Sequence, residues 1–238
     1  MNSALRRRGV SLIADWELEE RIAGRHLKKI LDLYRIDCVI DVGANMGQFR
    51  DFAVGAGWTG PIISFEPVES LFKALERRAK PPWRCYSSAL GSVCGESEIA
   101  IFDSPGLASL RPADFSAMAE LLPGGAPRQV ATQKIQVVRL DQIFDTINAG
   151  SKVLLKTDTQ GFDLEVFRGA SGCLDRICAL WVELSFLPIY RNAPSFVETL
   201  EEFGEAGFRV SDMFPVTHDK NLAAIEFDCA LVRSAARP

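Results

Sequence analysis

Apolar residues fall into short runs that alternate with segments of helical periodicity along most of the chain. Five runs predict strands, at residues 38–42, 61–66, 83–89, 152–158 and 177–184. The segments between and after them predict helices, at residues 47–56, 70–79, 164–169 and 195–206. Two more apolar runs, at residues 208–214 and 225–233, predict two further strands. This alternation is typical of an α/β protein with a doubly wound, mostly parallel sheet of seven strands.

Two segments lie outside this alternation. Residues 16–34 carry apolar side chains at roughly helical spacing, so we interpret residues 1–36 as an N-terminal helical cap on a main domain at 37–238. Residues 103–133 are rich in Pro, Gly, Ala and Ser, with a short helical pattern at 115–122. Long loops in compact domains are usually lids, binding loops or disordered. We therefore interpret 103–133 as a lid-like insertion, with an ordinary surface loop as the alternative.

The first predicted strand ends in a glycine turn, from Asp41 through Gly43 and Asn45 to Gly47, that opens a helix. Such a turn lets the backbone approach a ligand closely. Roughly twenty residues later, Glu66 closes the second strand, where doubly wound folds bind the two hydroxyls of an adenosine ribose. The spacing predicts a cofactor that contains adenosine.

The residues of the turn favour a cationic cofactor over a dinucleotide. A dinucleotide site has a glycine at the middle position of G-x-G-x-x-G, because the backbone must reach a pyrophosphate, and here that position is Asn45. Asp41 lies two residues before the first glycine, and its carboxylate would repel pyrophosphate but attract the ammonium and sulfonium groups of S-adenosylmethionine. We expect S-adenosylmethionine, and a dinucleotide-dependent oxidoreductase stays as a lesser alternative.

Several motifs in this order give the chain a family resemblance. From Cys38 to Arg233 it resembles the FkbM-type methyltransferases, and the resemblance rests on these residues: Asp41-Val42-Gly43-Ala44-Asn45-x-Gly47, Phe65-Glu66-Pro67, Ala89-Leu90-Gly91, Lys156-Thr157-Asp158-Thr159-Gln160-Gly161-Phe162-Asp163-Leu164-Glu165-Val166 and Val182-Glu183-Leu184-Ser185-Phe186. The resemblance implies the class I, Rossmann-like methyltransferase fold with an antiparallel last strand. It also implies S-adenosylmethionine as methyl donor and O-methylation of a natural product or sugar. Two segments depart from it: Ser87-Ser88-Ala89, and the 103–133 insertion beyond Ser109-Leu110.

We assign the cofactor residues from the turn and the strand ends. The methionine part of the donor would lie against the turn residues, Asp41, Gly43, Asn45 and Gly47. The ribose would bind Glu66 beside Pro67, and the adenine edge would meet Ser88 and Ala89.

The acceptor would lie beyond the carboxyl ends of the fourth and fifth strands, where Asp158 and Glu183 stand. Asp158 is a candidate general base or a ligand to Mg²⁺, and its structural alternative is a cap on the turn at Gly161. Glu183 is expected to be paired, because an isolated buried carboxylate is costly, and a salt bridge to Lys156 is its structural alternative. His218, in the predicted loop between the last two strands, is a weaker candidate base that could equally be solvated.

Composition and charge limit the kinds of partner and the location that we expect for the protein. The net charge is −4, and the one basic cluster, Arg6-Arg7-Arg8, is interpreted as a solvated tail, so nucleic acid is not expected as a partner. No apolar run approaches the roughly 18 residues of a membrane span, and we expect a cytoplasmic protein. The six cysteines are scattered without a C-x-x-C pair and are interpreted as reduced core residues. Composition leaves the oligomeric state open.

The combined expectation is O-methyl transfer to a hydroxyl on a small molecule, with S-adenosylmethionine as the donor. A methyltransferase assisted by a divalent cation is the second hypothesis. A non-catalytic S-adenosylmethionine-binding regulatory module is the third.

Overall fold

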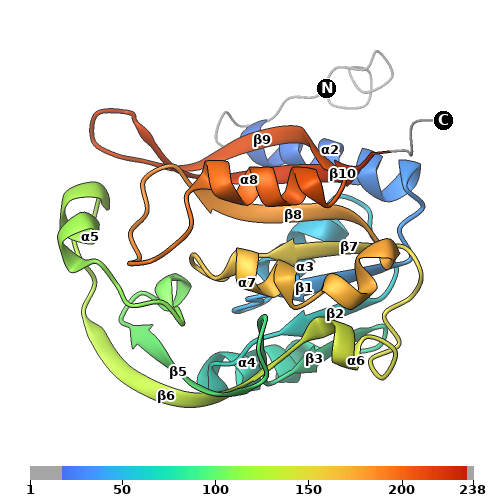
Figure 1. Ribbon diagram of the computed structural model, residues 1–238, viewed down its shortest axis with the longest axis horizontal. Helices are drawn as coiled ribbons and strands as arrows, with labels where there is room; N and C mark the ends of the chain where they lie inside the picture. The colour runs from blue at the N-terminus through green and yellow to red at the C-terminus, as the bar shows by residue number, and fades with distance from the viewer. Residues whose placement is uncertain (1–17, 235–238) are drawn as a thin grey trace, which may run out of the picture.

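The computed structural model describes residues 18–234 and is built on a seven-stranded sheet in the order β3-β2-β1-β7-β8-β10-β9 (Figure 1). Its strands are β1 (Cys38–Val42), β2 (Ile62–Phe65), β3 (Trp83–Tyr86), β7 (Val153–Thr157), β8 (Ile177–Ser185), β9 (Phe208–His218) and β10 (Ala224–Arg233). Only β10 runs antiparallel to both of its neighbours, β8 and β9. The predicted doubly wound, class I methyltransferase fold is confirmed. Arg6, Arg7, Arg8 and Trp16 lie outside the described residues.

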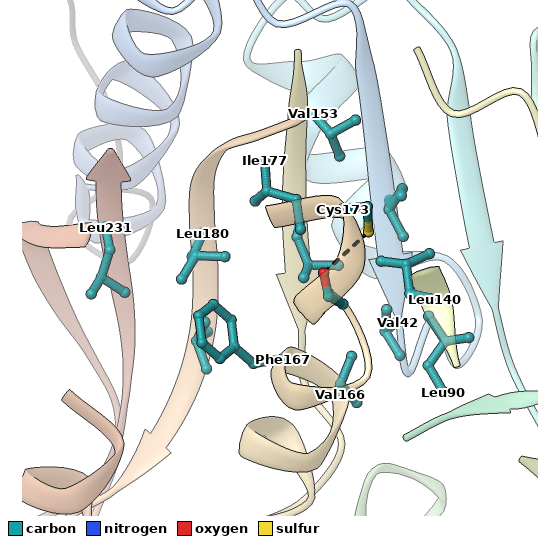
Figure 2. Packing of buried hydrophobic residues seen from close by; sticks show 14 of the residues in the cluster. Val42, Leu90, Leu140, Val153, Val166, Phe167, Cys173, Ile177, Leu180 and Leu231 are labelled. Carbon is teal, nitrogen blue, oxygen red and sulfur yellow. Dashed lines mark hydrogen bonds between the residues drawn. The ribbon is translucent and has the colours of Figure 1, made fainter. Parts of the chain in front are cut away.

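Helices cover both faces of the sheet and bury a separate apolar cluster on each. On one face lie α2 (Leu18–Leu33), α3 (Gln48–Gly55) and α4 (Glu69–Arg78), which bury Leu27, Phe49 and Leu75. On the other face lie α6 (Leu140–Ile143), α7 (Asp163–Arg168), η3 (Ser171–Arg176) and α8 (Phe196–Glu205). Figure 2 shows Phe167 and Leu180 in this second cluster. β1 and β7 are buried along their whole length, and their sequences are mostly apolar, with Asp41 in β1 and Lys156 and Thr157 in β7 as the polar exceptions.

The predicted bounds of the third strand, residues 83–89, were wrong. The run at residues 83–89 divides between two sheets: β3 ends at Tyr86, whose carbonyl accepts from Glu66 N–H, and β4 (Ala89–Leu90) joins a second sheet. That sheet has the order β4-β6-β5 and includes β5 (Gly95–Phe102) and β6 (Gln129–Val138), neither of which the sequence pattern predicted. The last residues of the predicted insertion, 129–133, therefore lie in a strand.

The remainder of the insertion packs against the loop that follows β8. It contains η2 (Pro105–Leu107) and α5 (Phe115–Leu121), and α5 confirms the helical pattern seen in the sequence. Asp114 caps α5 by accepting from the N–H groups of Ser116 and Ala117. Met118 is fully buried in a small cluster with Ile189 and Tyr190. The insertion thus has its own apolar anchor on the body of the protein.

The last two strands form a long antiparallel pair, and the prediction for residues 215–218 was wrong. β9 continues to His218 because Thr217 and His218 still pair with β10, so His218 ends a strand instead of lying in the loop. Within residues 18–234, no helix combines the length and the apolar character needed to cross a membrane.

Candidate active site

The glycine turn after β1 brings the backbone of two loops into contact. Gly43 has a positive φ of 72°, and a Cβ placed on it would lie 1.9 Å from the carbonyl oxygen of Asp158, at the end of β7. The N–H groups of Gly43 and Ala44 donate to the carbonyl of Phe65 at the end of β2. Only glycine fits this position, so the turn is fixed where the ends of β1, β2 and β7 meet.

Glu66 holds the other side of the turn. Its Oε2 accepts from Asn45 N–H at 2.8 Å and its Oε1 accepts from Val68 N–H at 2.9 Å. Burial raises the pKa of Glu66, and the two backbone donors oppose this rise because they stabilise the charged form. Asn45 has a positive φ of 47°, and its side-chain Oδ1 is buried and accepts no hydrogen bond from any described residue. A buried acceptor without a donor is costly unless a ligand supplies one.

Asp41 lies beneath the turn and is fully buried. Its Oδ1 lies 3.1 Å from Lys156 Nζ, and its Oδ2 accepts from Ser64 Oγ at 3.1 Å. Lys156 Nζ also donates to the carbonyl of Gly43 at 3.2 Å and lies 3.7 Å from Asp158 Oδ2. Burial alone would lower the pKa of Lys156, but the carboxylates of Asp41 and Asp158 raise it above its ordinary value. Asp41 therefore fixes a buried cation under the turn.

One cavity of about 1020 Å³ connects the turn to the strand ends and to the insertion. Its wall at the turn contains Gly43, Asn45 and Glu66. Residues of the insertion and of the sheet edge complete it, including Leu107, Ser109, Leu122, Phe214 and Val216. A cavity of this size is at the upper end of the range for small-molecule sites.

Four of the carboxyl groups that line the same cavity lie after β7, in β8 and in β10, and we call them the acidic cluster: Asp158, Glu183, Glu226 and Asp228. Asp158 follows β7, and Glu183 lies near the end of the neighbouring parallel strand, β8. The side-chain amide of Gln160 donates to both, at 3.2 Å to Asp158 Oδ1 and at 2.7 Å to Glu183 Oε1. The predicted meeting of Asp158 and Glu183 at one edge of the sheet is what the structure shows.

Burial and mutual repulsion raise the pKa values of three carboxyl groups in the cluster. Burial raises the pKa of Glu183 well above its usual range, and the carboxyls of Asp158 and Glu226 raise it further. Burial also raises the pKa of Glu226 to about 7 and that of Asp228 to about 6, although a hydrogen bond with the Trp181 side chain lowers the latter. Carboxyl groups with pKa values this close to neutrality are suited to accept and release protons.

Sequence reasoning missed Glu226 and Asp228, although β10 carries a signal for them. They are two residues apart in an otherwise apolar strand, so they lie on the same face of the sheet. Asp228 pairs directly with Glu183 across the β8–β10 ladder. Like charges in directly opposed positions are destabilising, which points to a function for the pair.

The structure separates the remaining predicted residues. Pro67 and Ala89 line the cavity. Gly47, with a positive φ of 89°, precedes α3 and packs near Trp83, while Ser88 is half-buried, and neither is among the residues that line the cavity. His218 is exposed at the end of β9 and is likewise absent from the cavity wall. The structural alternative for Glu183 was wrong, because Lys156 pairs with Asp41 and Asp158 instead.

The alternative of a magnesium ion bound by Asp158 and Glu183 does not fit these residues. In the part of the chain that the structure describes, no group of three or more His, Cys, Asp or Glu side chains is arranged to hold a metal ion. Asp158 and Glu183 share the amide of Gln160, and Asp158 lies beside Lys156.

Residues 41–210 match the methyltransferase FkbM domain. This match covers more than half of the chain and includes the glycine turn, Glu66, Asp158 and Glu183. The chain belongs to the FkbM methyltransferase family. No curated protein matches it.

Solved structures resemble this FkbM methyltransferase at low sequence identity. One is a putative S-adenosylmethionine-dependent methyltransferase from Listeria monocytogenes, with a TM-score of 0.49, 10% identity, and coverage of 90% of this chain and 100% of that one. A second is the 1,6-didemethyltoxoflavin-N1-methyltransferase of Burkholderia thailandensis, with a TM-score of 0.48, 12% identity, and coverage of 98% and 85%. A third is an rRNA methylase from Streptococcus thermophilus, with a TM-score of 0.48, 10% identity, and coverage of 94% and 100%.

The residues of this FkbM methyltransferase fit S-adenosylmethionine. Gly43 lines the cavity at a turn that lies directly against the Asp158 carbonyl, and the buried Oδ1 of Asn45 offers an acceptor to an ammonium group. Glu66 lines the cavity with a carboxylate that can accept from ribose hydroxyls. The acidic cluster supplies negative charge suited to a cationic sulfur.

Proposed function

We propose that the protein is an S-adenosylmethionine-dependent O-methyltransferase whose acceptor is a hydroxyl group on a small molecule. One observation carries the proposal: the paired carboxyls of Asp158 and Glu183 line the same cavity as Gly43 and Glu66. Donor-binding residues and proton acceptors therefore share one enclosed space, as a direct transfer between two bound molecules requires.

The chain would hold the donor through the turn and Glu66, and Lys156 would keep the turn in place through its bond to the Gly43 carbonyl. When bound, S-adenosylmethionine supplies a methyl carbon on a cationic sulfur. Alignment of a bound acceptor oxygen with that carbon is the positioning effect that enclosed sites provide. The cavity walls and the insertion would supply this alignment.

The acidic cluster would manage the proton of the acceptor hydroxyl. A hydroxyl oxygen that gains a methyl group must lose its proton, and a carboxylate within hydrogen-bond reach can accept it. Glu183, whose pKa burial raises well above its usual range, holds a proton more readily than an ordinary glutamate. We assign proton transfer to Asp158 Oδ or Glu183 Oε, with Glu226 and Asp228 as hydrogen-bond acceptors for other hydroxyls of the acceptor molecule.

A screen of hydroxyl-bearing small molecules, scored by release of S-adenosylhomocysteine, tests the proposal. Sugars, phenols and polyketide alcohols form the first panel, and amines of matched size form the second. We expect release with one hydroxyl class and a methyl ether as the product by mass spectrometry. Methylation of amines alone would refute the O-methyl assignment.

Two further outcomes of the same screen address the alternatives. Activity lost in EDTA and restored by Mg²⁺ would favour the metal-assisted hypothesis. Cofactor binding by calorimetry, without acceptor-dependent release across both panels, would favour a regulatory module that binds S-adenosylmethionine.

A further inference from the structure

Gln160 occupies an unusual place in the turn between β7 and α7. It is 8% exposed, and its φ of 54° lies in the left-handed region that glycine favours. Non-glycine residues persist in this region when their surroundings fix them. The Gln160 carbonyl accepts from Ser109 Oγ of the insertion at 2.8 Å, so a buried contact from another part of the chain holds the strained turn.

The orientation of the Gln160 amide follows from its neighbours. Its Nε2 lies 3.2 Å from Asp158 Oδ1 and 2.7 Å from Glu183 Oε1, and its Oε1 lies 3.0 Å from the hydroxyl of Tyr190. If the amide were turned around, its oxygen would face two carboxyl oxygens. The two N–H groups of the amide therefore serve the two carboxyls, and Tyr190 holds the opposite end.

Without this amide, Asp158 and Glu183 would face each other across neighbouring strands with nothing between them to donate. Like charges at close range repel, and side chains that repel take up separate rotamers. Lys156 offsets only part of this repulsion, since it lies 3.7 Å from Asp158 and also serves Asp41 and the Gly43 carbonyl.

We propose that Gln160 is a positioning residue, which holds the carboxyl groups of Asp158 and Glu183 side by side at the cavity and is itself held by Tyr190 and Ser109. The proposal rests on the proposed function, because it assigns the two carboxyls to the acceptor. It also links the insertion to the reaction, since Ser109 belongs to the insertion and the single proton of the Tyr190 hydroxyl is shared between Gln160 Oε1 and the carbonyl of Leu107 at 2.8 Å.

This role has a measurable consequence for the ionisation of Glu183. An N–H that donates to a carboxylate favours the charged form, so removal of the amide makes Glu183 hold its proton to higher pH. Four carboxyl groups raise the pKa of Glu183, one from the residue after β7, one from α7 and two from β10: Asp158, Asp163, Glu226 and Asp228. Lys156 of β7, 3.7 Å from Asp158, is the cation nearest to this pair. Loss of the Gln160 donor would leave the repulsion offset only in part, by Lys156 beside Asp158.

Gln160→Met tests the proposal, because methionine keeps the length of the side chain and removes both donors. Gln136→Met is the matched control: Gln136 donates to Glu96 at 3.2 Å on the exposed face of the second sheet. Carbon-13 NMR titration of the glutamate carboxyl carbons, with S-adenosylhomocysteine bound, reads out Glu183, whose signal Glu183→Gln assigns. We expect the titration midpoint to rise by about one pH unit in Gln160→Met and to stay unchanged in Gln136→Met.

An unchanged midpoint in folded Gln160→Met would overturn the proposal. If Gln160→Met does not fold, Tyr190→Phe removes only the hydroxyl that orients the amide, and a smaller upward shift is expected; no shift there would also overturn the proposal. Neither titration needs an acceptor, so failure of the proposed function would leave these results intact. With an acceptor in hand, kcat should fall about tenfold or more, with its acid limb at higher pH and KM little changed.

Discussion

Gly43 shows how a single backbone position defines the cofactor site. Since a Cβ there would lie 1.9 Å from the Asp158 carbonyl, Gly43→Ala must push two loops apart. We expect a lower melting temperature and an affinity for S-adenosylmethionine at least tenfold weaker, measured by thermal unfolding and calorimetry. Gly55→Ala is the control, because a Cβ at Gly55 meets nothing within 4 Å and alanine favours a helix. Equal behaviour of the two variants would contradict this account of the turn.

Glu66 joins the glycine turn to the ribose position. Glu66→Ala removes the acceptor of Asn45 N–H and Val68 N–H together with the proposed ribose contacts. Charge-assisted hydrogen bonds of this kind contribute about 1.5–3 kcal/mol each, so calorimetry should show binding weaker by about 2 kcal/mol or more. Glu69→Ala is the control, because Glu69 is exposed and pairs with Lys73. Unchanged affinity in folded Glu66→Ala would refute the ribose assignment.

Asp158→Asn separates charge from shape at the acceptor. The side chain is 37% exposed, so its replacement should leave the melting temperature near that of the wild type. If Asp158 takes or relays the hydroxyl proton, turnover should fall by about 10²-fold while cofactor affinity changes little. Asp145→Asn, at an exposed position after α6, should leave both unchanged. Near-normal turnover would make Asp158 structural, and lost cofactor binding would move it to the donor side.

At the scale of elements, burial decides which strands the sequence predicts. β1 and β7 lie in the interior of the sheet and are apolar except for a few buried polar residues towards their carboxyl ends, so the pattern predicts them well. β5 and β6 are half-exposed, and most of their positions are polar or solvent-facing. The two strands pair across the insertion, so the pattern of neighbouring residues does not predict their pairing. The end of β3 before Ser87-Ser88 was also not visible in the sequence. The apolar run stops there because Ala89 pairs with β6 in the second sheet, which is a long-range contact.

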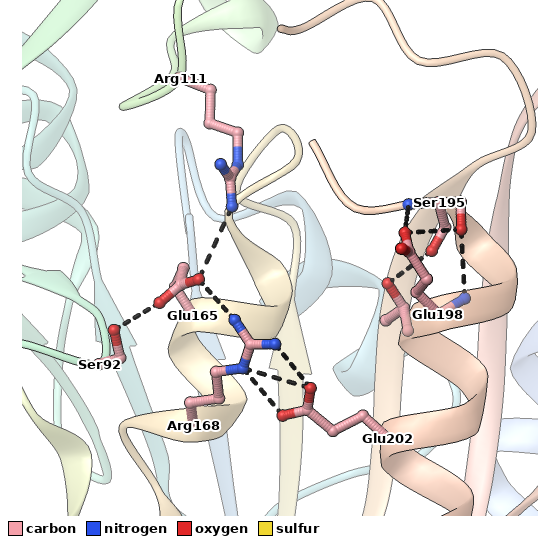
Figure 3. Close-up of polar contacts among 8 residues, drawn as sticks. Ser92, Arg111, Glu165, Arg168, Ser195, Glu198 and Glu202 are labelled. Atoms are coloured by element: carbon pink, nitrogen blue, oxygen red, sulfur yellow. Dashed lines mark hydrogen bonds and ion pairs between the residues drawn. The ribbon is translucent and has the colours of Figure 1, made fainter. Parts of the chain in front are cut away.

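The insertion is tied to α7 by side chains that sequence patterns do not reveal. Arg111 Nε donates to the Gly161 carbonyl at 2.6 Å, and Arg111 Nη2 lies 3.8 Å from Glu165, which Arg168 also contacts (Figure 3). We interpret the insertion as a lid that these contacts hold over the cavity.

Limited proteolysis tests the lid. Arg111→Ala should speed cleavage within residues 103–133, because it removes the contacts to Gly161 and Glu165. In the wild type, S-adenosylhomocysteine together with an acceptor should slow cleavage there, as closure over substrate would. Arg128→Ala, an exposed position paired only with Asp103 in the same insertion, is the control. Equal cleavage in all variants and ligand states would make the insertion an ordinary surface loop.

At the scale of the whole molecule, the sequence predicted the site residues that lie at the ends of parallel strands. It did not predict those that reach the site through the register of the antiparallel strands. Asp158 and Glu183 follow from the rule that ligands bind beyond the carboxyl ends of parallel strands. Asp228 reaches the same cavity because the antiparallel register sets it opposite Glu183, and register is a property of the folded sheet. Lys156 gave a misleading signal, since it pairs with buried Asp41 and with partly exposed Asp158 and not with Glu183.

The acidic cluster should make the stability of the ligand-free protein fall as pH rises. Burial raises the pKa of Asp228 to about 6 and that of Glu226 to about 7, and it also raises the pKa of the neighbouring Asp163 to about 6, whereas unfolded carboxyls titrate near pH 4. The folded state thus binds more protons than the unfolded state between these values. This stabilisation is fully present below about pH 4 and is lost as pH rises through about 6 to about 7. Thermal unfolding between about pH 5 and about pH 8 should show the decline.

A variant and a ligand separate this electrostatic cause from a general effect of pH. Glu226→Gln removes one carboxyl whose pKa is raised, so the melting temperature of this variant should decline less steeply as pH rises. Glu201→Gln, at an exposed position on α8, should follow the wild type. S-adenosylmethionine carries one net positive charge and would lie beside the cluster, so its stabilising effect should grow as the carboxyls ionise. The melting-temperature increase that it causes should therefore be larger at about pH 8 than at about pH 5. An increase that is independent of pH would mean that the cluster does not sense the cofactor, and the negative charge would then be reserved for the acceptor.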